Sequence, residues 1–180
     1  MERYKGRPAA SECRGPQEIA VYDFLGRLGL EYDTLCHPAA FTMEECAAVE
    51  RELGAGICKN LFLANRQQTR FYLLMIPAGK AFKTKYLSSQ LGCARLSFAA
   101  EEQMWRLLGI RPGAVSPMGL MNDGAGEVTL VVDRDLLAEE HIGCHPCVNT
   151  ATLKLRLADV LERFAPATGH QPAVVDLPAE

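Results

Sequence analysis

The sequence lacks several features that would assign it to a class of protein at once. No apolar run reaches the roughly 18 residues of a membrane-spanning helix, so we expect no membrane partner. The basic residues near the start are not followed by an apolar core, so residues 1–15 do not predict a secretory signal. The net charge is only −3, which gives no general attraction for nucleic acid, and any RNA contact must use a local basic patch.

Familiar catalytic motifs are also missing. The chain has no G-x-S-x-G elbow, no H-E-x-x-H motif and no evident Ser–His–Asp arrangement. The glycine-rich residues 113–119 form neither a Walker loop, since G-K-[ST] is absent, nor a dinucleotide fingerprint. We therefore expect no cofactor and no side-chain nucleophile, but a site that binds and polarises its substrate.

The seven cysteines are an odd number and are scattered along the chain, which fits no compact disulfide framework. They favour a reducing cytoplasm, with several thiols packed as small apolar side chains. Cys144 and Cys147 form a C-x-x-C pair, for which a zinc site, a redox pair and incidental cysteines are the alternatives. Zinc needs two further ligands, and a redox pair favours a helix N-terminus, whereas this pair lies between two predicted strands.

The order of elements predicts an α+β fold with a mixed, mostly antiparallel sheet and surrounding helices. We expect a flexible lead-in over residues 1–15 and a single domain over residues 16–180. Thr42 and Glu45 form a capping box for one helix, and Ser97 is expected to cap another. Periodicity and glycine stops predict helices over residues 17–28, 43–53, 83–91, 99–108 and 158–164. The predicted strands cover residues 31–37, 57–63, 70–76, 128–132, 141–145, 150–155 and 174–175.

Lys59 and Asn60 open an apolar run that reads as a buried strand. An unpaired ammonium is costly inside a core, so Lys59 is expected at the mouth of a site, aimed at an anionic partner. The alternative is a lysine at the start of a strand whose charge reaches water.

Two other segments could contribute to such a site. His145 precedes a proline in a loop between predicted strands, where it could position a substrate, or simply be a hydrogen-bonded loop residue. His37 has the same local form, and there we favour the second interpretation. The loop over residues 113–119 could bring backbone amides close to a ligand carbonyl or phosphate, although it could also be a simple turn.

A basic stretch runs from Gly79 to Arg95 without an acidic residue. On a net-acidic protein it predicts a phosphate-facing patch, with a solvated helix face as the alternative. Its candidate phosphate contacts are Lys80, Lys83 and Lys85.

Four motifs, KNLFL at 59–63, SPMGLMND at 116–123, HPCVNTAT at 145–152 and ATGHQPAVVDL at 167–177, resemble one family in order and spacing. This is the YbaK/prolyl-tRNA synthetase-associated family, and the nearest branch is the free-standing Ala-tRNA(Pro) deacylases (ProX or PrdX-like). The resemblance implies a cytoplasmic trans-editing hydrolase that removes alanine from mischarged tRNA(Pro). Its partners would be the acceptor end of that tRNA and prolyl-tRNA synthetase.

The resemblance also implies roles for individual residues. Lys59 would hold the phosphate of the terminal adenosine, Asn60 would hydrogen-bond in the same site, and His145 would help to select by size. The pocket would be lined by backbone groups of the glycine-rich loop, from Gly113 through Ser116, Pro117 and Met118 to Gly119. The family is thought to use no metal, with the terminal ribose 2′-hydroxyl helping to activate water.

A second class of function stays open, a catalytically silent module that binds tRNA or regulates proline metabolism. The third is a thiol or metal protein built on Cys144 and Cys147. A charge kept at the start of an apolar strand favours the enzyme over the silent module.

Overall fold

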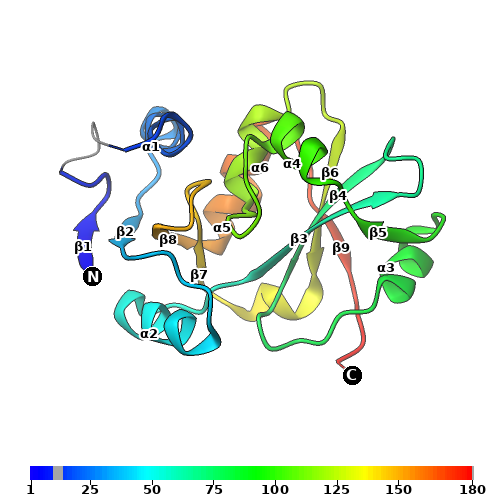
Figure 1. The fold of residues 1–180 in the computed structure, drawn as a ribbon, viewed down its shortest axis with the longest axis horizontal. Helices are drawn as coiled ribbons and strands as arrows, with labels where there is room; N and C mark the ends of the chain where they lie inside the picture. Colours follow the sequence, from blue (N-terminus) through cyan, green and yellow to red (C-terminus); the bar gives the residue numbers. More distant parts are fainter. Residues whose placement is uncertain (10–13, 180) are drawn as a thin grey trace.

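Two β-sheets form the framework of the computed structural model, which describes residues 1–9 and 14–179 (Figure 1). The smaller sheet is antiparallel throughout, in the order β1 (Glu2–Lys5), β2 (Asp33–Cys36), β8 (Ala151–Arg156) and β7 (His141–Cys144). The larger sheet is mixed, in the order β5 (Leu96–Phe98), β3 (Lys59–Asn65), β4 (Phe71–Ile76), β6 (Val128–Asp133) and β9 (Ala173–Val175). The predicted α+β fold is confirmed.

Helices surround these sheets, and four of them end where a glycine adopts a left-handed backbone conformation, as their glycine stops predicted. They are α1 (Pro16–Leu28), α2 (Met43–Leu53), α3 (Thr84–Leu91) and α4 (Glu101–Leu108). The capping box predicted at Thr42 is present at the start of α2. Shorter elements are the 3-10 helices η2 (Pro117–Asn122) and η3 (Arg134–Ala138), and a final helix that runs through α5 (Leu157–Asp159), the π-helical η4 (Val160–Phe164) and α6 (Ala165–Ala167).

The larger sheet is buried on both faces, which explains why all six residues of β4 are apolar and inaccessible. One face lies on the main core. On the other, Leu87 of α3 packs with Leu63 and Leu74. The smaller sheet is covered in part by α2, where Leu35 packs with two helix residues, Val49 and Leu53.

Two local predictions are wrong, and strand pairing is the reason for both. Glu2–Lys5 is not a frayed lead-in but strand β1, which pairs with β2 although its polar residues give no apolar pattern. Residues 10–13 of the predicted lead-in lie outside the described residues. Ser97 does not cap a helix, because it lies in β5, whose pairing with β3 delays the start of α4 until Glu101.

Candidate functional site

Lys59 is the first residue of β3, opposite Ile76, and its side chain is half-buried. Its Nζ donates a 2.7 Å hydrogen bond to the backbone carbonyl of Lys80. It forms no ion pair with another described residue. Since an ammonium has three donors, this contact fixes the side chain and leaves two N–H groups for an anionic ligand.

Lys80 serves a different purpose from the one predicted. Its buried Nζ lies 2.8 Å from Oδ2 of Asp133 and 2.7 Å from Oδ2 of Asp135. Burial opposes the charge, but hydrogen bonds to the two carboxylates raise the pKa of Lys80 above its ordinary value. The expected phosphate contact does not carry over to Lys80, because two carboxylates already neutralise its ammonium. The side chain instead anchors the loop whose carbonyl holds Lys59.

A short backbone contact brings Lys59 and His145 to the same end of the molecule. Residues Ile57 and Gly143 form a parallel bridge between the two sheets, and the amide of Cys58 donates to the carbonyl of Gly143 at 3.3 Å. Because the bridge is parallel, the two segments continue from it in the same direction. Lys59 lies two residues after Ile57, and His145 lies two residues after Gly143.

Asn60 connects to the glycine-rich loop through buried thiols. The Cys58 thiol lies 3.6 Å from the Asn60 Oδ1, and the Asn60 Nδ2 lies 3.4 Å from the carbonyl of Cys58. Cys144 is buried close enough to Cys58 and to the Ser116 side chain for both to shift its pKa. The structure thus brings three predicted segments together around a wall of small, buried side chains.

These thiols are neutral at physiological pH. Burial raises the pKa of Cys58 and of Cys147 to about 12. Burial and the nearby Cys58 raise the pKa of Cys144 well above its ordinary value, against the hydrogen bond to Ser116. In the part of the chain that the structure describes, no three cysteine, histidine or acidic side chains gather as metal ligands. Buried thiols that are neutral pack as apolar side chains, because thiolates are the reactive and metal-binding form.

His145 is held in one orientation by its Nδ1, which lies 2.8 Å from the carbonyl oxygen of Ala151. Because a carbonyl can only accept, Nδ1 carries the proton and the neutral ring keeps a lone pair on Nε2. Burial lowers the pKa of His145, and the nearby His37 adds to this effect. The buried His37 is hydrogen-bonded at both ring nitrogens, to Pro38 and Thr152, as expected for a structural histidine.

The glycine-rich loop is exposed at its start and buried at its end. Gly113 is exposed with a φ of +91°, whereas the four other predicted pocket residues are buried. The amides of Met118 and Gly119 already donate within the turn, to Oγ and the carbonyl of Ser116. A Cβ on Gly119 would lie 2.7 Å from the Ile110 side chain. The buried end of the loop, Pro117 to Gly119, therefore packs against the core and supports the loop. The exposed start of the loop, at Gly113, remains available to a ligand.

Three of the hollows in the described part of the structure are relevant to these residues. A cavity of 340 Å³ runs along the outer side of the glycine-rich loop, where it is lined by Ala114, Cys147 and Asn149 with Trp105 and Arg111. Sequence reasoning missed these last two residues, because only folding places the Arg111 guanidinium 3.9 Å from the Trp105 ring centre. A second hollow, of 790 Å³, includes Lys83 and Lys85 of the predicted patch.

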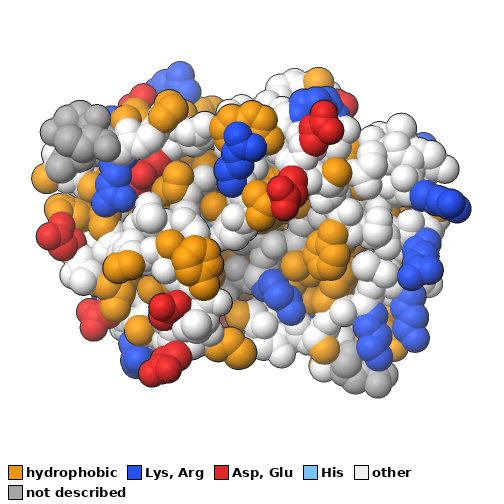
Figure 2. All heavy atoms as spheres, viewed as in Figure 1, with side chains coloured by type: hydrophobic (Ala, Val, Ile, Leu, Met, Phe, Trp, Pro, Cys, Tyr) orange, Lys and Arg blue, Asp and Glu red, His pale blue; other side chains and the backbone are white. Residues whose placement is uncertain are grey.

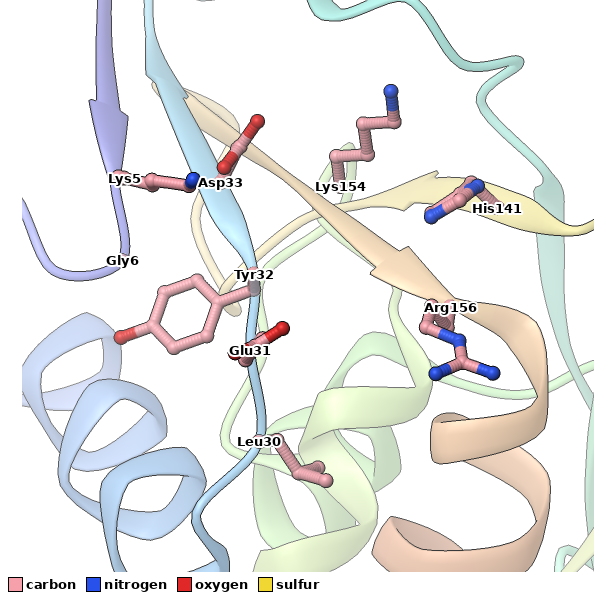
Figure 3. Close-up of a pocket in the computed structure, with 9 residues that line it drawn as sticks. All are labelled: Lys5, Gly6, Leu30, Glu31, Tyr32, Asp33, His141, Lys154 and Arg156. Atoms are coloured by element: carbon pink, nitrogen blue, oxygen red, sulfur yellow. The ribbon is translucent and has the colours of Figure 1, made fainter.

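The third hollow, of 510 Å³, lies on the open part of the smaller sheet (Figure 3). Lys154 and Arg156 project from β8 and His141 from β7. Asp33 lies at the start of the neighbouring strand β2, and Glu31 precedes it. It contains none of the predicted site residues, and Glu31 and Asp33 offset part of the positive charge of Lys5, Lys154 and Arg156.

Comparisons with known proteins identify the class. A family model described as the aminoacyl-tRNA editing domain matches residues 37–162, a range that contains all the predicted site residues. The prolyl-tRNA editing protein ProX of Acetoanaerobium sticklandii is 33% identical over 158 residues, covering 88% of this chain and 96% of ProX. The prolyl-tRNA synthetase associated domain-containing protein 1 of Danio rerio is 36% identical over 155 residues, 85% of this chain and 83% of that protein.

A crystal structure described as a proposed trans-editing enzyme for prolyl-tRNA synthetase has the same fold, with a TM-score of 0.66 at 21% identity. The similarity covers 91% of this chain and 99% of the chain in that crystal structure. The chain belongs to the aminoacyl-tRNA editing domain family. It is accordingly an aminoacyl-tRNA deacylase, an enzyme that edits mischarged tRNA. No helix in the described ranges is long and apolar enough to cross a membrane.

Proposed function

We propose that this enzyme hydrolyses the ester of mischarged tRNA(Pro), with Ala-tRNA(Pro) as its main substrate. The observation that carries the proposal is Lys59, an ammonium held by one backbone carbonyl, outside every ion pair with described residues, on a wall of neutral groups. The similarity to ProX over nearly the whole chain supports the choice of tRNA(Pro). Alanine is the expected error because a pocket built for proline cannot exclude a smaller side chain by more than about 1–3 kcal/mol.

Lys59 binds the phosphate of the terminal adenosine with its two remaining N–H groups, and Asn60 donates or accepts a hydrogen bond beside it. The Lys80 loop keeps the ammonium at the entrance to the site, so that it does not have to be ordered when the substrate binds. The charge therefore serves to position the ester rather than to attack it.

A water molecule attacks the ester carbonyl, assisted by the ribose 2′-hydroxyl of the substrate. The thiols nearby are neutral and buried, which makes them poor nucleophiles. The exposed start of the glycine-rich loop, at Gly113, faces the carbonyl and stabilises its developing charge. The neutral His145, fixed through Ala151, walls the pocket and limits the size of the aminoacyl group.

The test is deacylation of alanine-charged tRNA(Pro) by the wild type and by Lys59→Ala, with proline-charged tRNA(Pro) as the control substrate. Lys154→Ala is the matched control variant, since Lys154 is also a half-buried strand lysine but lies on β8. We expect fast release of alanine by the wild type and Lys154→Ala, no release by a folded Lys59→Ala, and retention of proline by all three.

Other outcomes would change the assignment. If the wild type spares alanine but releases serine, cysteine or threonine, the enzyme edits a different error. If it binds tRNA and cleaves none of these esters, the alternative of a silent binding or regulatory module holds. Equal activity of Lys59→Ala and wild type would remove Lys59 from the site.

The mischarged tRNA would come from prolyl-tRNA synthetase, and we propose that the reaction takes place in the cytoplasm. The six cysteines among the described residues are all unpaired thiols, which suits a reducing compartment. A direct complex with the synthetase would appear as co-sedimentation of the two proteins with and without tRNA. Co-sedimentation only with tRNA would mean that the two enzymes meet through their substrate.

A further inference from the structure

The second hollow lies beside the proposed site, between the start of α3 and strand β5. It has a volume of 790 Å³ and combines three cationic side chains with two phenylalanines: Lys83, Lys85, Arg95, Phe82 and Phe98. Figure 2 shows the Lys and Arg side chains that gather over α3 and β5 on this face.

The charge of this hollow is not balanced by the protein. The sequence has no acidic residue from Gly79 to Ala100, and none of the three cations forms an ion pair with another described residue. The helix α3 begins here, with Lys83 at its N-cap, no side-chain cap and no acidic residue in its first turn. Both features favour anions, and phosphate is an anion that suits lysine, arginine and helix amides together.

The aromatic side chains distinguish this hollow from a simple basic patch. Phe98 is 64% exposed although it lies on a strand, while the half-buried Phe82 packs on the apolar cluster beneath α3. An exposed phenyl ring beside unpaired cations is the combination that proteins use for single-stranded RNA, whose phosphates take the charges and whose bases stack.

The hollow is also within reach of the ester. The carbonyl of Lys80 holds Lys59. Lys83 lies three residues after Lys80, so the Cα atoms of Lys80 and Lys83 are at most about 11 Å apart. A nucleotide next to the terminal adenosine could therefore enter the hollow while the adenosine phosphate contacts Lys59.

We propose that this hollow is a subsite for an unpaired nucleotide of the tRNA acceptor end. The base that precedes the terminal adenosine stacks on Phe98, and the phosphate on its 5′ side lies against Lys83, Lys85 and Arg95. The phosphate that it shares with the adenosine stays on Lys59. The subsite rests on the proposed function and adds to it a recognition of the acceptor end that does not depend on the amino acid.

The experiment measures the binding of uncharged acceptor minihelices to the wild type, Phe98→Ala and Phe98→Trp. Leu137→Ala is the control variant, because Leu137 is another exposed apolar side chain but borders a hollow that also contains Glu139 and Glu140. We expect Phe98→Ala to weaken binding by about 5- to 150-fold, the range for loss of one stacked base. Phe98→Trp and Leu137→Ala should bind as the wild type does.

The base is identified with minihelices in which each unpaired nucleotide before the terminal adenosine is replaced in turn by an abasic one. For one of them the wild type should lose as much affinity as Phe98→Ala, and the two changes together should cost no more than either alone. Lys83→Ala and Lys85→Ala should each flatten the slope of log affinity against log salt by about 0.7–0.9.

Two results would overturn the subsite. The first is that Phe98→Ala binds the RNA as tightly as the wild type, and the second is that Phe98→Ala weakens the binding of every abasic RNA as much as it weakens that of the intact RNA. Because the RNA is uncharged, this result is independent of ester cleavage. If the wild type cleaves no ester but Phe98 and one base are coupled in binding, the subsite stands and the proposed hydrolysis fails.

Discussion

Replacing Lys80 by methionine tests how the loop that holds Lys59 is anchored. The Lys80 ammonium lies 2.8 Å from the Asp133 carboxylate and 2.7 Å from the Asp135 carboxylate, so distance does not separate the two pairs. Their burial differs, since the side chain of Asp133 is 0% exposed and that of Asp135 is 59% exposed. We expect burial to decide the energetics, because water screens the second pair and not the first.

The magnitude follows from that difference. Among the described residues, Lys80→Met leaves the buried Asp133 carboxylate with only the amide of Leu177 as its partner. Loss of one member of a buried ion pair costs about 3–5 kcal/mol. Asp135→Asn removes a solvent-screened pair and should cost about 0–1 kcal/mol. With a urea dependence of about 2 kcal/mol per M, Lys80→Met lowers the unfolding midpoint by about 1.5–2.5 M.

Urea unfolding at pH 7, followed by circular dichroism, measures both variants. Adding Asp133→Asn to Lys80→Met should recover part of the loss, because no unpaired charge then stays buried. The deacylation rate of Lys80→Met should also fall when it is measured under conditions in which the variant is folded. The reason is that the backbone carbonyl of residue 80 is then no longer fixed beside Lys59. Equal midpoint shifts for Lys80→Met and Asp135→Asn would refute the reasoning from burial.

Three further outcomes are expected. Gly119→Ala should cost about 1–3 kcal/mol in urea unfolding, because its methyl group meets Ile110 at 2.7 Å and the carbonyl of Leu108 at 3.0 Å; a neutral result would mean that the loop can shift. Thr42→Ala should cost about 1 kcal/mol, since it opens the capping box of α2, whereas Thr42→Ser should restore most of this stability. Burial lowers the pKa of His145 in the folded protein, so its contribution is complete above the unfolded pKa of about 6.5 and is lost as the pH falls from that value through the lower pKa of the folded state. Relative to His145→Asn, the wild type should therefore lose stability below about pH 6.5, and a constant difference down to pH 5 would contradict this.

Much of the fold follows from local signals in the sequence. Apolar periodicity predicted α1, and a continuous apolar run predicted β4. Glycines predicted where four helices stop, and Thr42 with Glu45 predicted the start of α2. These signals work because backbone hydrogen bonds and steric limits act between residues close in sequence. The strand β1 and the role of Ser97 in β5 escaped prediction, because each depends on a partner strand distant in the chain.

The sequence by itself determined the family, through motifs whose order and spacing survive without knowledge of the fold, and it singled out Lys59, Asn60 and His145. It could not reveal that Lys80 is neutralised, because Asp133, whose buried carboxylate pairs with the Lys80 ammonium, lies 53 residues away in the sequence. Nor could it reveal that Phe98 stands exposed beside Lys83, since an apolar residue in a strand is ordinarily core. Residue type sets what a side chain can do, but only tertiary packing decides which charges are already paired and which remain available to a ligand.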